Sequence, residues 1–393
     1  MSKLFVVSEL FYPDETSTAF VMTKIVNKLA EINDDIEVIC SDSNYDDSNL
    51  KSENYNLASK VKRVGIKSYK GSKNNLLLRT FRFFSLSLKM FFYLLRHVKT
   101  KDKVVIVTNP APIIVLAYIL KKIKSNFLVI IVHDVFPENT IPAGIFKSKN
   151  STFYKFLLKI FNISYSFADR LIVVGRDVGK VILNKIGENN EEKIIVIENW
   201  AETSDVLPHF ASPLKDKIVF QFAGNIGRVQ GLKELLEVIK DVKNDLLEFH
   251  FVGDGAVKQE LIDYCKENRL INVVFKPSYK REEQTRILND SDIAIVTLSQ
   301  GMFGLGVPSK SYNIMAAGKP ILYIGDKDGE IDHVVNENNI GYSFENYQDL
   351  KLFFNSLGTE DKSKLIEMGK KARKLAETIY SEETILNKYQ RFI

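Results

Sequence analysis

This sequence is poor in the residues that cross-link a fold or hold a metal ion. It has two cysteines and five histidines among 393 residues. Cys40 and Cys265 lie far apart in apolar segments, which fits buried thiols in a reducing compartment and argues against a disulfide framework. The cysteines and histidines show no zinc-ligand spacing, and the Gly-x4-Gly-Lys-Ser/Thr loop of ATPases is missing. We therefore expect no metal site and no ATPase activity.

Long apolar runs are missing as well. The most apolar stretch, residues 104–120, is interrupted by Asn109, Pro110 and Pro112. A bilayer-spanning helix needs about 20 consecutive apolar residues, so a buried strand, a loop and a helix fit this stretch better. The first apolar residues are too few for a secretory leader and predict a strand. We expect a cytoplasmic protein without a membrane span.

The excess of one charge is small, since 54 Lys and Arg residues oppose 49 Asp and Glu residues. The formal net charge of +5 does not point to nucleic acid, and no nucleic-acid-binding motif accompanies the basic residues. Apolar residues make up 45% of the chain, which is ordinary for a folded protein. At roughly 150 residues per domain, the length predicts two domains.

Short apolar runs alternate with longer helical patterns through most of the chain. This alternation predicts parallel sheets with helices on both faces, an α/β fold. The segment 201–216 lacks periodicity and contains two prolines, so we place the domain boundary there. We predict two Rossmann-like, doubly wound domains facing a cleft, residues 1–205 and 206–378, with a C-terminal helix, 379–393, returning to the first domain. The candidate strands are residues 4–8, 36–40, 104–107, 128–132, 171–174, 194–197, 219–223, 248–252, 273–275, 293–296 and 321–324.

A glycine-rich turn between a strand and a helix is the first feature with chemical content. Residues 222–239 contain Gly224, Gly227 and Gly231, which let the backbone approach a ligand. The N-terminus of the following helix suits phosphate, and Arg228 and Lys233 could add charge-assisted contacts to a diphosphate. An ordinary strand–helix turn is the alternative interpretation.

A second feature lies in residues 304–325, where Ser309 and Lys310 precede a helical pattern. Both residues are expected at the start of the helix, where an anion is favoured. Asn313 follows about one turn later and could hydrogen-bond a ribose hydroxyl. The alternative is helix capping followed by a tight helix–strand connection.

The order of these elements resembles glycosyltransferase family 4, a retaining family with the GT-B fold. The resemblance covers residues 222–239, 249–261, 273–296 and 307–322, nearly all of the C-terminal domain. In the N-terminal domain it rests mainly on residues 8–20 and 132–138. The chain is most similar to the capsule, O-antigen and colanic-acid glycosyltransferases of that family.

The resemblance implies a nucleotide-sugar pocket in the C-terminal domain. The matching positions are the diphosphate turn at Gly224, Asn225 and Arg228, a second glycine turn at Gly253, the base-facing segment Phe275, Lys276 and Pro277, and a donor-side loop at Glu330. The chain departs from the family where Leu305 and Asn313 replace two glutamates. Asn313 can still bond a ribose, whereas Leu305 cannot orient the sugar as a carboxylate would. Asn225 and Gln230 likewise replace a basic pair.

In the N-terminal domain, residues 16–20 occupy the place of the family's glycine-rich first loop. The acceptor-side candidates are Glu15, Thr16, Ser17 and Thr18. Their side chains could meet the acceptor or a donor phosphate. Capping of the following helix by Thr16 or Ser17 is the alternative.

His133 and Asp134 follow a buried apolar strand, so we expect both at its carboxyl end, where ligands of α/β sheets bind. These two residues are the catalytic candidates. His133 could hydrogen-bond the transferred sugar or assist proton movement. A histidine satisfied within the core is the alternative.

Residues 60–103 contain thirteen Lys or Arg residues and one acidic residue, Asp102. A basic helix rich in aromatic residues suits anionic lipid headgroups, with its rings entering the interface. The residues expected to contact the membrane are Arg79, Arg82, Lys89, Phe91, Phe92 and Arg96. An ordinary domain helix with a buried aromatic face is the alternative.

These observations predict a glycosyltransferase at the inner face of the cell membrane. We expect it to move a sugar from a nucleotide-sugar, bound as substrate and not as cofactor, to a polyprenyl-diphosphate-linked saccharide. The resemblance implies retention of configuration without a metal ion. Asp290-Ser291-Asp292 has the spacing of a GT-A metal motif but precedes a strand, so it is interpreted as a helix end. Two alternatives stay open, a sugar-nucleotide epimerase of GT-B fold and a membrane-associated scaffold without activity.

Overall fold

The computed structural model describes residues 2–14, 16–42, 56–68, 76–146, 148–212, 214 and 216–393. The chain forms two compact units. The first contains Met1–Ile141, Phe146–Ile197 and Leu386–Ile393, and the second contains Pro142–Ile145 and Glu198–Ile385. Apart from Pro142–Ile145, the chain enters the second unit after Ile197 and returns to the first after Ile385, whereas the sequence placed these transitions after residues 205 and 378.

A parallel sheet forms the centre of the first unit. Among the described residues it has seven strands in the order β3-β2-β1-β4-β5-β6-β7. The strands are β1 (Leu4–Val7), β2 (Ile36–Ser41), β3 (Val61–Ile66), β4 (Lys103–Val107), β5 (Phe127–Val132), β6 (Arg170–Val173) and β7 (Ile194–Val196). Strands β1 and β2 are buried along their whole lengths, because helices cover both faces. The strand order reverses between β1 and β4, and such a switch point is where α/β sheets bind ligands.

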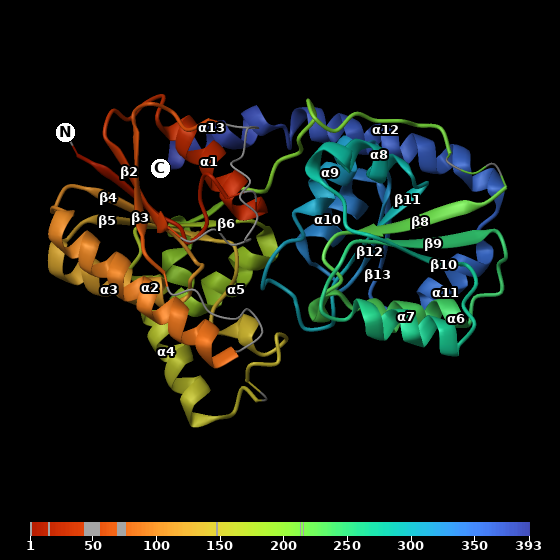
Figure 1. The fold of residues 1–393 in the computed structure, drawn as a ribbon, viewed down its shortest axis with the longest axis horizontal. Helices are drawn as coiled ribbons and strands as arrows, with labels where there is room; N and C mark the ends of the chain where they lie inside the picture. The colour runs from red at the N-terminus through yellow and green to blue at the C-terminus, as the bar shows by residue number, and fades with distance from the viewer. Residues whose placement is uncertain are drawn as a thin grey trace. The chain divides into compact units, whose positions relative to one another are not determined.

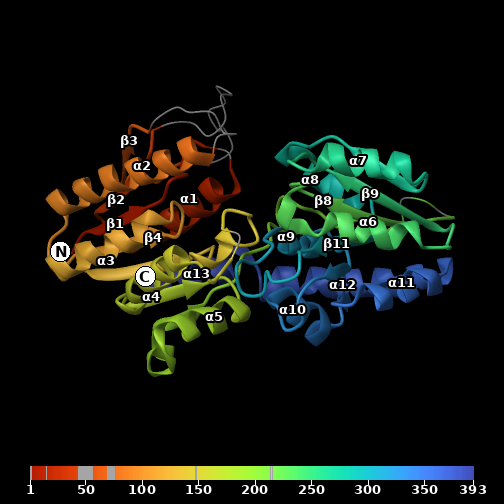
Figure 2. The ribbon, with the colours of Figure 1, turned by 90° about the horizontal axis from the view of Figure 1, so that it is seen from below.

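Helices form a layer on each face of this sheet, as Figures 1 and 2 show. On one face, the end of α13 lies against α1, where the Gln390 amide donates to the Lys28 carbonyl at 3.1 Å. On the other face α2, α3, α4 and α5 lie side by side, each packed against the next. The bounds are α1 (Ser17–Leu29), α2 (Leu76–His97), α3 (Pro112–Lys124), α4 (Thr152–Ser166), α5 (Arg176–Ile186) and α13 (Glu382–Phe392), with 3-10 turns η1 (Glu138–Thr140) and η2 (Glu188–Lys193).

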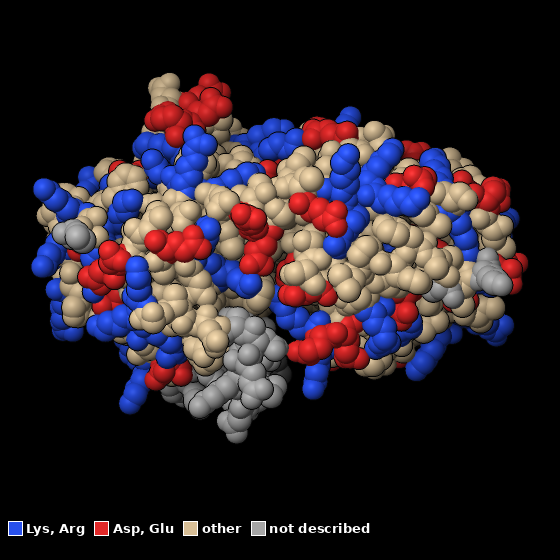
Figure 3. Space-filling view, turned by 90° about the horizontal axis from the view of Figure 1, so that it is seen from above, with Lys and Arg blue, Asp and Glu red and all other residues tan. Residues whose placement is uncertain are grey.

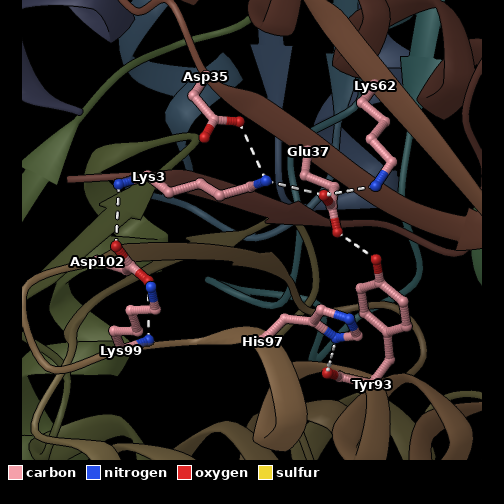
Figure 4. Close-up of polar contacts among 8 residues, drawn as sticks. All are labelled: Lys3, Asp35, Glu37, Lys62, Tyr93, His97, Lys99 and Asp102. Atoms are coloured by element: carbon pink, nitrogen blue, oxygen red, sulfur yellow. Dashed lines mark hydrogen bonds and ion pairs between the residues drawn. The ribbon is translucent and has the colours of Figure 1, made fainter. Parts of the chain in front are cut away.

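A buried carboxylate fixes the orientation of α2 on the sheet (Figure 4). Glu37 in β2 has a side chain that is 2% exposed and accepts hydrogen bonds from the Tyr93 hydroxyl and from Lys62. Lys3 pairs with the same carboxylate at 2.9 Å. These contacts outweigh burial and hold the pKa of Glu37 below its ordinary value. The face of α2 that carries Tyr93 therefore points into the unit, and the opposite face points out.

We expect Tyr93→Phe to lower the free energy of unfolding by about 1–2 kcal/mol, because a buried carboxylate loses a hydrogen bond. Urea denaturation followed by circular dichroism measures it. Tyr118→Phe is the matched control, because its hydroxyl makes no hydrogen bond to another described residue. Equal midpoints for the two variants would show that the Tyr93 hydroxyl does not hold α2 in place.

A second parallel sheet forms the centre of the other unit, with the order β10-β9-β8-β11-β12-β13 in the described chain. Its strands are β8 (Ile218–Ala223), β9 (Leu247–Val252), β10 (Val273–Lys276), β11 (Ile293–Thr297), β12 (Ile321–Ile324) and β13 (Gly341–Phe344). Separate apolar cores lie on its two faces. One face is covered by α6 (Leu232–Lys240), α7 (Lys258–Glu267) and α11 (Tyr347–Ser356), the other by α8 (Gln284–Asn289), α9 (Lys310–Ala316), α10 (Glu330–Asn338) and α12 (Lys362–Thr378). The remaining short turns are η3 (Arg228–Gln230), η4 (Arg281–Glu283) and η5 (Thr359–Asp361).

Two consequences bear on function. All strand pairs are parallel in each sheet, so their carboxyl ends lie along one edge, and the loops after them can converge on a ligand. Within the described residues, no helix is both long enough and apolar enough to cross a membrane.

Candidate active site

Two interlocked glycine turns follow β8 and β9. The backbone N–H of Gly224 donates to the Val252 carbonyl at 2.9 Å, and that of Ile226 donates to the Asp254 carbonyl at 2.8 Å. A Cβ atom on Gly253 would lie 1.9 Å from the Gly224 carbonyl oxygen, and Gly253 has φ of +143°. Only glycine permits both the backbone conformation and this approach. The turns therefore present closely packed backbone at the carboxyl edge of the sheet.

Lys310 brings a cation to the first of these turns. Helix α9 begins at Lys310 with Ser309 as the N-cap residue, as the sequence predicts. The Lys310 ammonium lies 3.4 Å from the centroid of the Phe222 ring in β8, and its stem lies beside Gly224. Burial lowers the pKa of Lys310 to about 7. No carboxylate of the described residues pairs with Lys310, so the arrangement is open to an anionic ligand.

The other basic residues near this turn differ in what they contact. Arg228 is exposed in η3, directly before α6. Lys233 in α6 pairs with Glu260 in α7 at 3.1 Å, and both side chains are largely exposed. A diphosphate contact by Lys233 would have to replace that ion pair. Asn225, which stands where the family has a basic residue, is exposed.

Asn313 is already engaged by the protein. Its side-chain oxygen accepts from the Glu202 backbone N–H at 3.0 Å, and its amide nitrogen donates to the Glu202 carboxylate at 3.2 Å. Arg281 in η4 forms an ion pair with the same carboxylate. The predicted hydrogen bond to a ribose would have to displace these contacts. Glu202, which follows the buried Trp200 on the segment leaving β7, was not singled out from the sequence, and only its neighbours in space draw attention to it.

The remaining donor-side candidates lie along the same sheet. Phe275 at the end of β10 stacks on Phe251 with ring centroids 5.3 Å apart, and Pro277 behind it is exposed. The carbonyl oxygens of Lys276 and Gly253 both accept from the Lys258 ammonium, at 3.2 and 2.6 Å. Lys258 thus ties the ends of β9 and β10 together. Glu330 is buried as the first residue of α10, and Leu305, the family's first glutamate position, is also buried.

In the first unit, His133 and Asp134 follow β5, at the carboxyl edge of the sheet as predicted. Burial lowers the pKa of His133 to about 4, and its Nε2 atom has no hydrogen-bond partner among the described residues. Asp134 accepts from the Asn139 amide at 2.9 Å, while burial raises its pKa. His133 is therefore a neutral imidazole at physiological pH, suited to one further hydrogen bond and poorly suited to carry a proton.

Glu138 and Lys185 form an ion pair next to this segment that the sequence did not reveal. The Lys185 ammonium, with a side chain only 4% exposed, lies 2.5 Å from one Glu138 oxygen. The other oxygen of Glu138 and the side-chain oxygen of Asn139 are buried without partners among the described residues. With His133, three buried polar atoms in residues 133–139 have no hydrogen-bond partner in the described part of the chain. Buried polar atoms rarely stay unpaired, so this segment suits a ligand rich in hydroxyl groups.

Three of the acceptor-side candidates, Thr16, Ser17 and Thr18, lie at the start of α1. The Thr16 hydroxyl accepts from the Ala19 backbone N–H at 3.3 Å, so Thr16 caps α1. Ser17 and Thr18 are in the first turn of the helix, and Ser17 is exposed. Glu15 lies outside the described residues. The structure shows Thr16 as the N-cap residue of α1, and contact of these side chains with an acceptor stays a prediction.

The predicted membrane residues on α2 divide between its two faces. Phe91 is 8% exposed, so the prediction that its ring enters a membrane is wrong. Arg82 pairs with the buried Glu9 at 3.0 Å and is also turned inward. Phe92, Lys89 and Arg96 are exposed. The side chain of Arg79 lies outside the described residues.

The Asp290-Ser291-Asp292 segment has a structural role. One Asp292 carboxylate oxygen accepts from the Val219 backbone N–H at 2.8 Å, which joins the start of β11 to β8. Asp290 is the C-cap residue of α8, as the sequence predicts for a helix end. Over the described ranges, no group of three acidic, histidine or cysteine side chains could hold a metal ion.

Comparison with known proteins places this geometry in a family context. A family model described as glycosyl transferases group 1 matches residues 208–375. WbjE of Pseudomonas aeruginosa, named as a probable glycosyltransferase, is 35% identical over 355 residues, 87% of this chain and 86% of WbjE. WcaI of Escherichia coli, named for colanic acid biosynthesis, is 27% identical over 153 residues, 36% of this chain and 38% of WcaI.

Solved structures share the whole fold. HepE from Anabaena in complex with UDP matches with a TM-score of 0.71 at 15% identity, covering 100% of this chain and 99% of its own. The predicted α/β fold with two Rossmann-like domains of the GT-B type is therefore confirmed. At 15% identity the likeness by itself shows only the fold.

Proposed function

Because this chain belongs to the group 1 glycosyltransferases, we propose that it transfers a sugar from a nucleotide-sugar donor to a polyprenyl-diphosphate-linked saccharide. One observation carries the donor half of this proposal. Lys310 lies against Phe222 beside the interlocked glycine turns, without a carboxylate partner in the described chain. A half-buried cation next to the backbone of the glycine turns suits a diphosphate. HepE, which has the same fold, binds UDP, and this supports a nucleotide donor.

The residues suggest how the reaction is assisted. The diphosphate leaves with growing negative charge, which Lys310, the N–H groups at the start of α6 and the exposed Arg228 would stabilise. The positive charge that stabilises the diphosphate comes from the protein itself, so we propose transfer without a metal ion. Retention of configuration is proposed from the resemblance to family 4.

The acceptor half rests on relatives and on the chemistry of residues 133–139. The name of WcaI assigns it to colanic acid biosynthesis, and we propose a comparable role in a capsule, O-antigen or similar surface polysaccharide. The buried polar atoms of His133, Glu138 and Asn139 that have no partner among the described residues suit sugar hydroxyls. A polyprenyl-linked acceptor stays in the bilayer, so the protein would work as a peripheral protein at the inner face of the cell membrane.

Product analysis tests the proposal. The protein is incubated with UDP-, GDP- and dTDP-sugars and a polyprenyl-diphosphate-linked saccharide, with and without EDTA. A new glycosidic bond, retained in anomeric configuration and formed in EDTA, is the expected result. An isomerised nucleotide sugar would instead establish an epimerase, and an unchanged mixture with intact donor binding would favour a scaffold.

We expect His133→Ala to lower turnover about tenfold while the affinity for the nucleotide stays constant, because one hydrogen bond to the transferred sugar is lost. Initial rates and calorimetry measure the two effects. Since the pKa of His133 is about 4, the variant should not alter the shape of the pH–rate profile above pH 6. Full activity of the folded variant, with a lowered melting temperature, would make His133 a core residue without a part in the reaction.

A further inference from the structure

Three neighbouring helices of the first unit contain no acidic residue. α2, α3 and α4 together carry nine Lys or Arg residues and neither Asp nor Glu. Helices of the second unit differ, since α6 and α7 both mix acidic and basic residues. The side of the molecule shown in Figure 3, opposite to the side seen in Figure 2, also intersperses acidic and basic side chains. The absence of acidic residues therefore distinguishes α2, α3 and α4, whereas α5, which packs against α4 on the same face, contains the buried Asp177.

The outer side of the same layer exposes large apolar side chains. On α2 the exposed rings are Phe81 and Phe84, 62% and 52% exposed, together with Phe92. On α4 and directly after it the exposed apolar side chains are Phe153 and Phe156, 60% and 57% exposed, together with Ile163 and Phe167. Ile119 and Ile123 on α3 are exposed between them. Soluble monomers rarely expose so many large apolar side chains on adjoining elements, and such patches mark interaction sites.

Cations accompany these rings. Lys155 and Lys159 are exposed on α4, as are Lys89 and Arg96 on α2. The Lys122 ammonium at the end of α3 lies 4.1 Å from the centroid of the Phe167 ring. None of these five cations forms an ion pair with a described carboxylate. The layer therefore presents unneutralised positive charge together with exposed rings.

The most exposed rings gather at one end of the layer. Each helix of this layer begins near the carboxyl edge of the parallel sheet and runs back, because it connects two parallel strands. Phe81 and Phe84 lie in the first half of α2, and Phe153 and Phe156 lie in the first turns of α4. These rings are thus closer to the edge that carries His133 than to the opposite edge.

We propose that the outer face of α2, α3 and α4 docks on a bilayer with anionic headgroups, with α4 as a principal contact. The proposal rests on the proposed function only for its purpose, to bring the acceptor-binding edge to a lipid-linked saccharide. A lipid surface suits this face because amphipathic helices with rings and Lys or Arg side chains lie in the interfacial plane. A protein partner would need acidic side chains opposite cations on three helices, whereas an anionic bilayer offers negative headgroups to all of these cations.

Vesicle flotation tests this, with vesicles of phosphatidylcholine alone or mixed with phosphatidylglycerol. We expect Lys155→Gln/Lys159→Gln to weaken binding to the anionic vesicles about 30-fold, at about 1 kcal/mol for each charge near the surface. The control Lys240→Gln/Lys266→Gln removes two exposed charges from the second unit and should leave binding unchanged. Equal loss in the two pairs would overturn the proposal, because net charge alone would then explain it.

The rings are tested separately. Phe153→Ser/Phe156→Ser should weaken binding to both kinds of vesicle at least about tenfold, since insertion of rings depends little on charge. The control Ile271→Ser/Leu352→Ser changes two exposed side chains of the second unit, one of them 96% exposed. Two results with the wild-type protein would contradict the proposal. One is that it binds neither kind of vesicle, and the other is that it binds neutral and anionic vesicles with equal affinity. Self-association of the wild type relieved by the α4 variant would likewise contradict it and make this face a contact between copies.

Transfer to a water-soluble acceptor separates this inference from the proposed function. The docking variants should keep wild-type rates with such an acceptor and lose rate only with the vesicle-borne one. If the wild type transfers sugar to the soluble acceptor but fails to bind vesicles, the function stands and the docking surface is wrong. If it binds vesicles as expected but transfers no sugar, the docking surface stands and the function is wrong.

Discussion

Gly253→Ala is expected to lower the free energy of unfolding by about 3 kcal/mol or more. Two costs add in this variant. The backbone at Gly253, with φ of +143°, disfavours any L side chain, and the new Cβ would lie 1.9 Å from the Gly224 carbonyl oxygen. That oxygen belongs to backbone, so relief requires the two turns after β8 and β9 to separate. Thermal and urea unfolding measure the loss.

The matched control is Gly301→Ala. Gly301 also has positive φ, +83°, but no atom lies within 4 Å of the position that its new Cβ would take. Only the conformational cost, about 1 kcal/mol, should appear there. Any Gly253→Ala protein that stays folded should bind nucleotide-sugar more weakly, because the diphosphate turn has moved. Equal stability of the two variants would refute the interlocked turns.

Lys310→Ala should weaken nucleotide-sugar binding by roughly 10- to 100-fold, since a charge-assisted contact contributes about 1.5–3 kcal/mol. Calorimetry measures the affinity. Arg228→Ala should weaken binding less, because its side chain is exposed. Lys233→Ala is the matched control, with an ammonium already paired with Glu260. Unchanged affinity in Lys310→Ala would remove the diphosphate from this turn.

The same residue predicts a dependence of binding on pH. In the free protein the pKa of Lys310 is about 7, and a bound diphosphate favours the ammonium form and raises that pKa. Binding then takes up a proton, so affinity is constant below pH 7 and falls as the pH rises towards the pKa of the complex. The slope is at most about tenfold per pH unit. A nucleotide sugar is the suitable probe, because its phosphates titrate well below this range, and Lys310→Ala should abolish the slope.

The buried strands were predictable because continuous apolar runs mark them. Residues 36–40 and 128–132 were predicted as strands, and the structure has Ile36–Ser41 and Phe127–Val132. The strands β3 and β13 were not predicted. Both are edge strands whose sequences contain no continuous apolar run, unlike the edge strands β7 and β10, which were predicted.

Positions within elements were predictable, whereas contacts between distant residues were not. The start of a helix at Lys310 followed from local sequence, but its place over Phe222 depends on how β8 and α9 meet. The hydrogen bond between Asn313 and Glu202, which lie 111 residues apart, has no signal in the local sequence either. On α2, aromatic residues occur on several sides, so the sequence could not show which rings are buried. The pairing of Tyr93 with Glu37 settles that orientation.

The segment that carries Glu202 also contains the chain's single tryptophan, Trp200. Because Trp200 is buried two residues before Glu202, the intrinsic indole fluorescence of the whole protein comes from this one place. Emission excited at the red edge of the protein absorption band therefore reports on the segment around Glu202, which Asn313 and Arg281 contact. If a bound nucleotide replaces Glu202 as the hydrogen-bond partner of Asn313, the environment of the indole changes. The protein thus carries an optical probe of that exchange without a label.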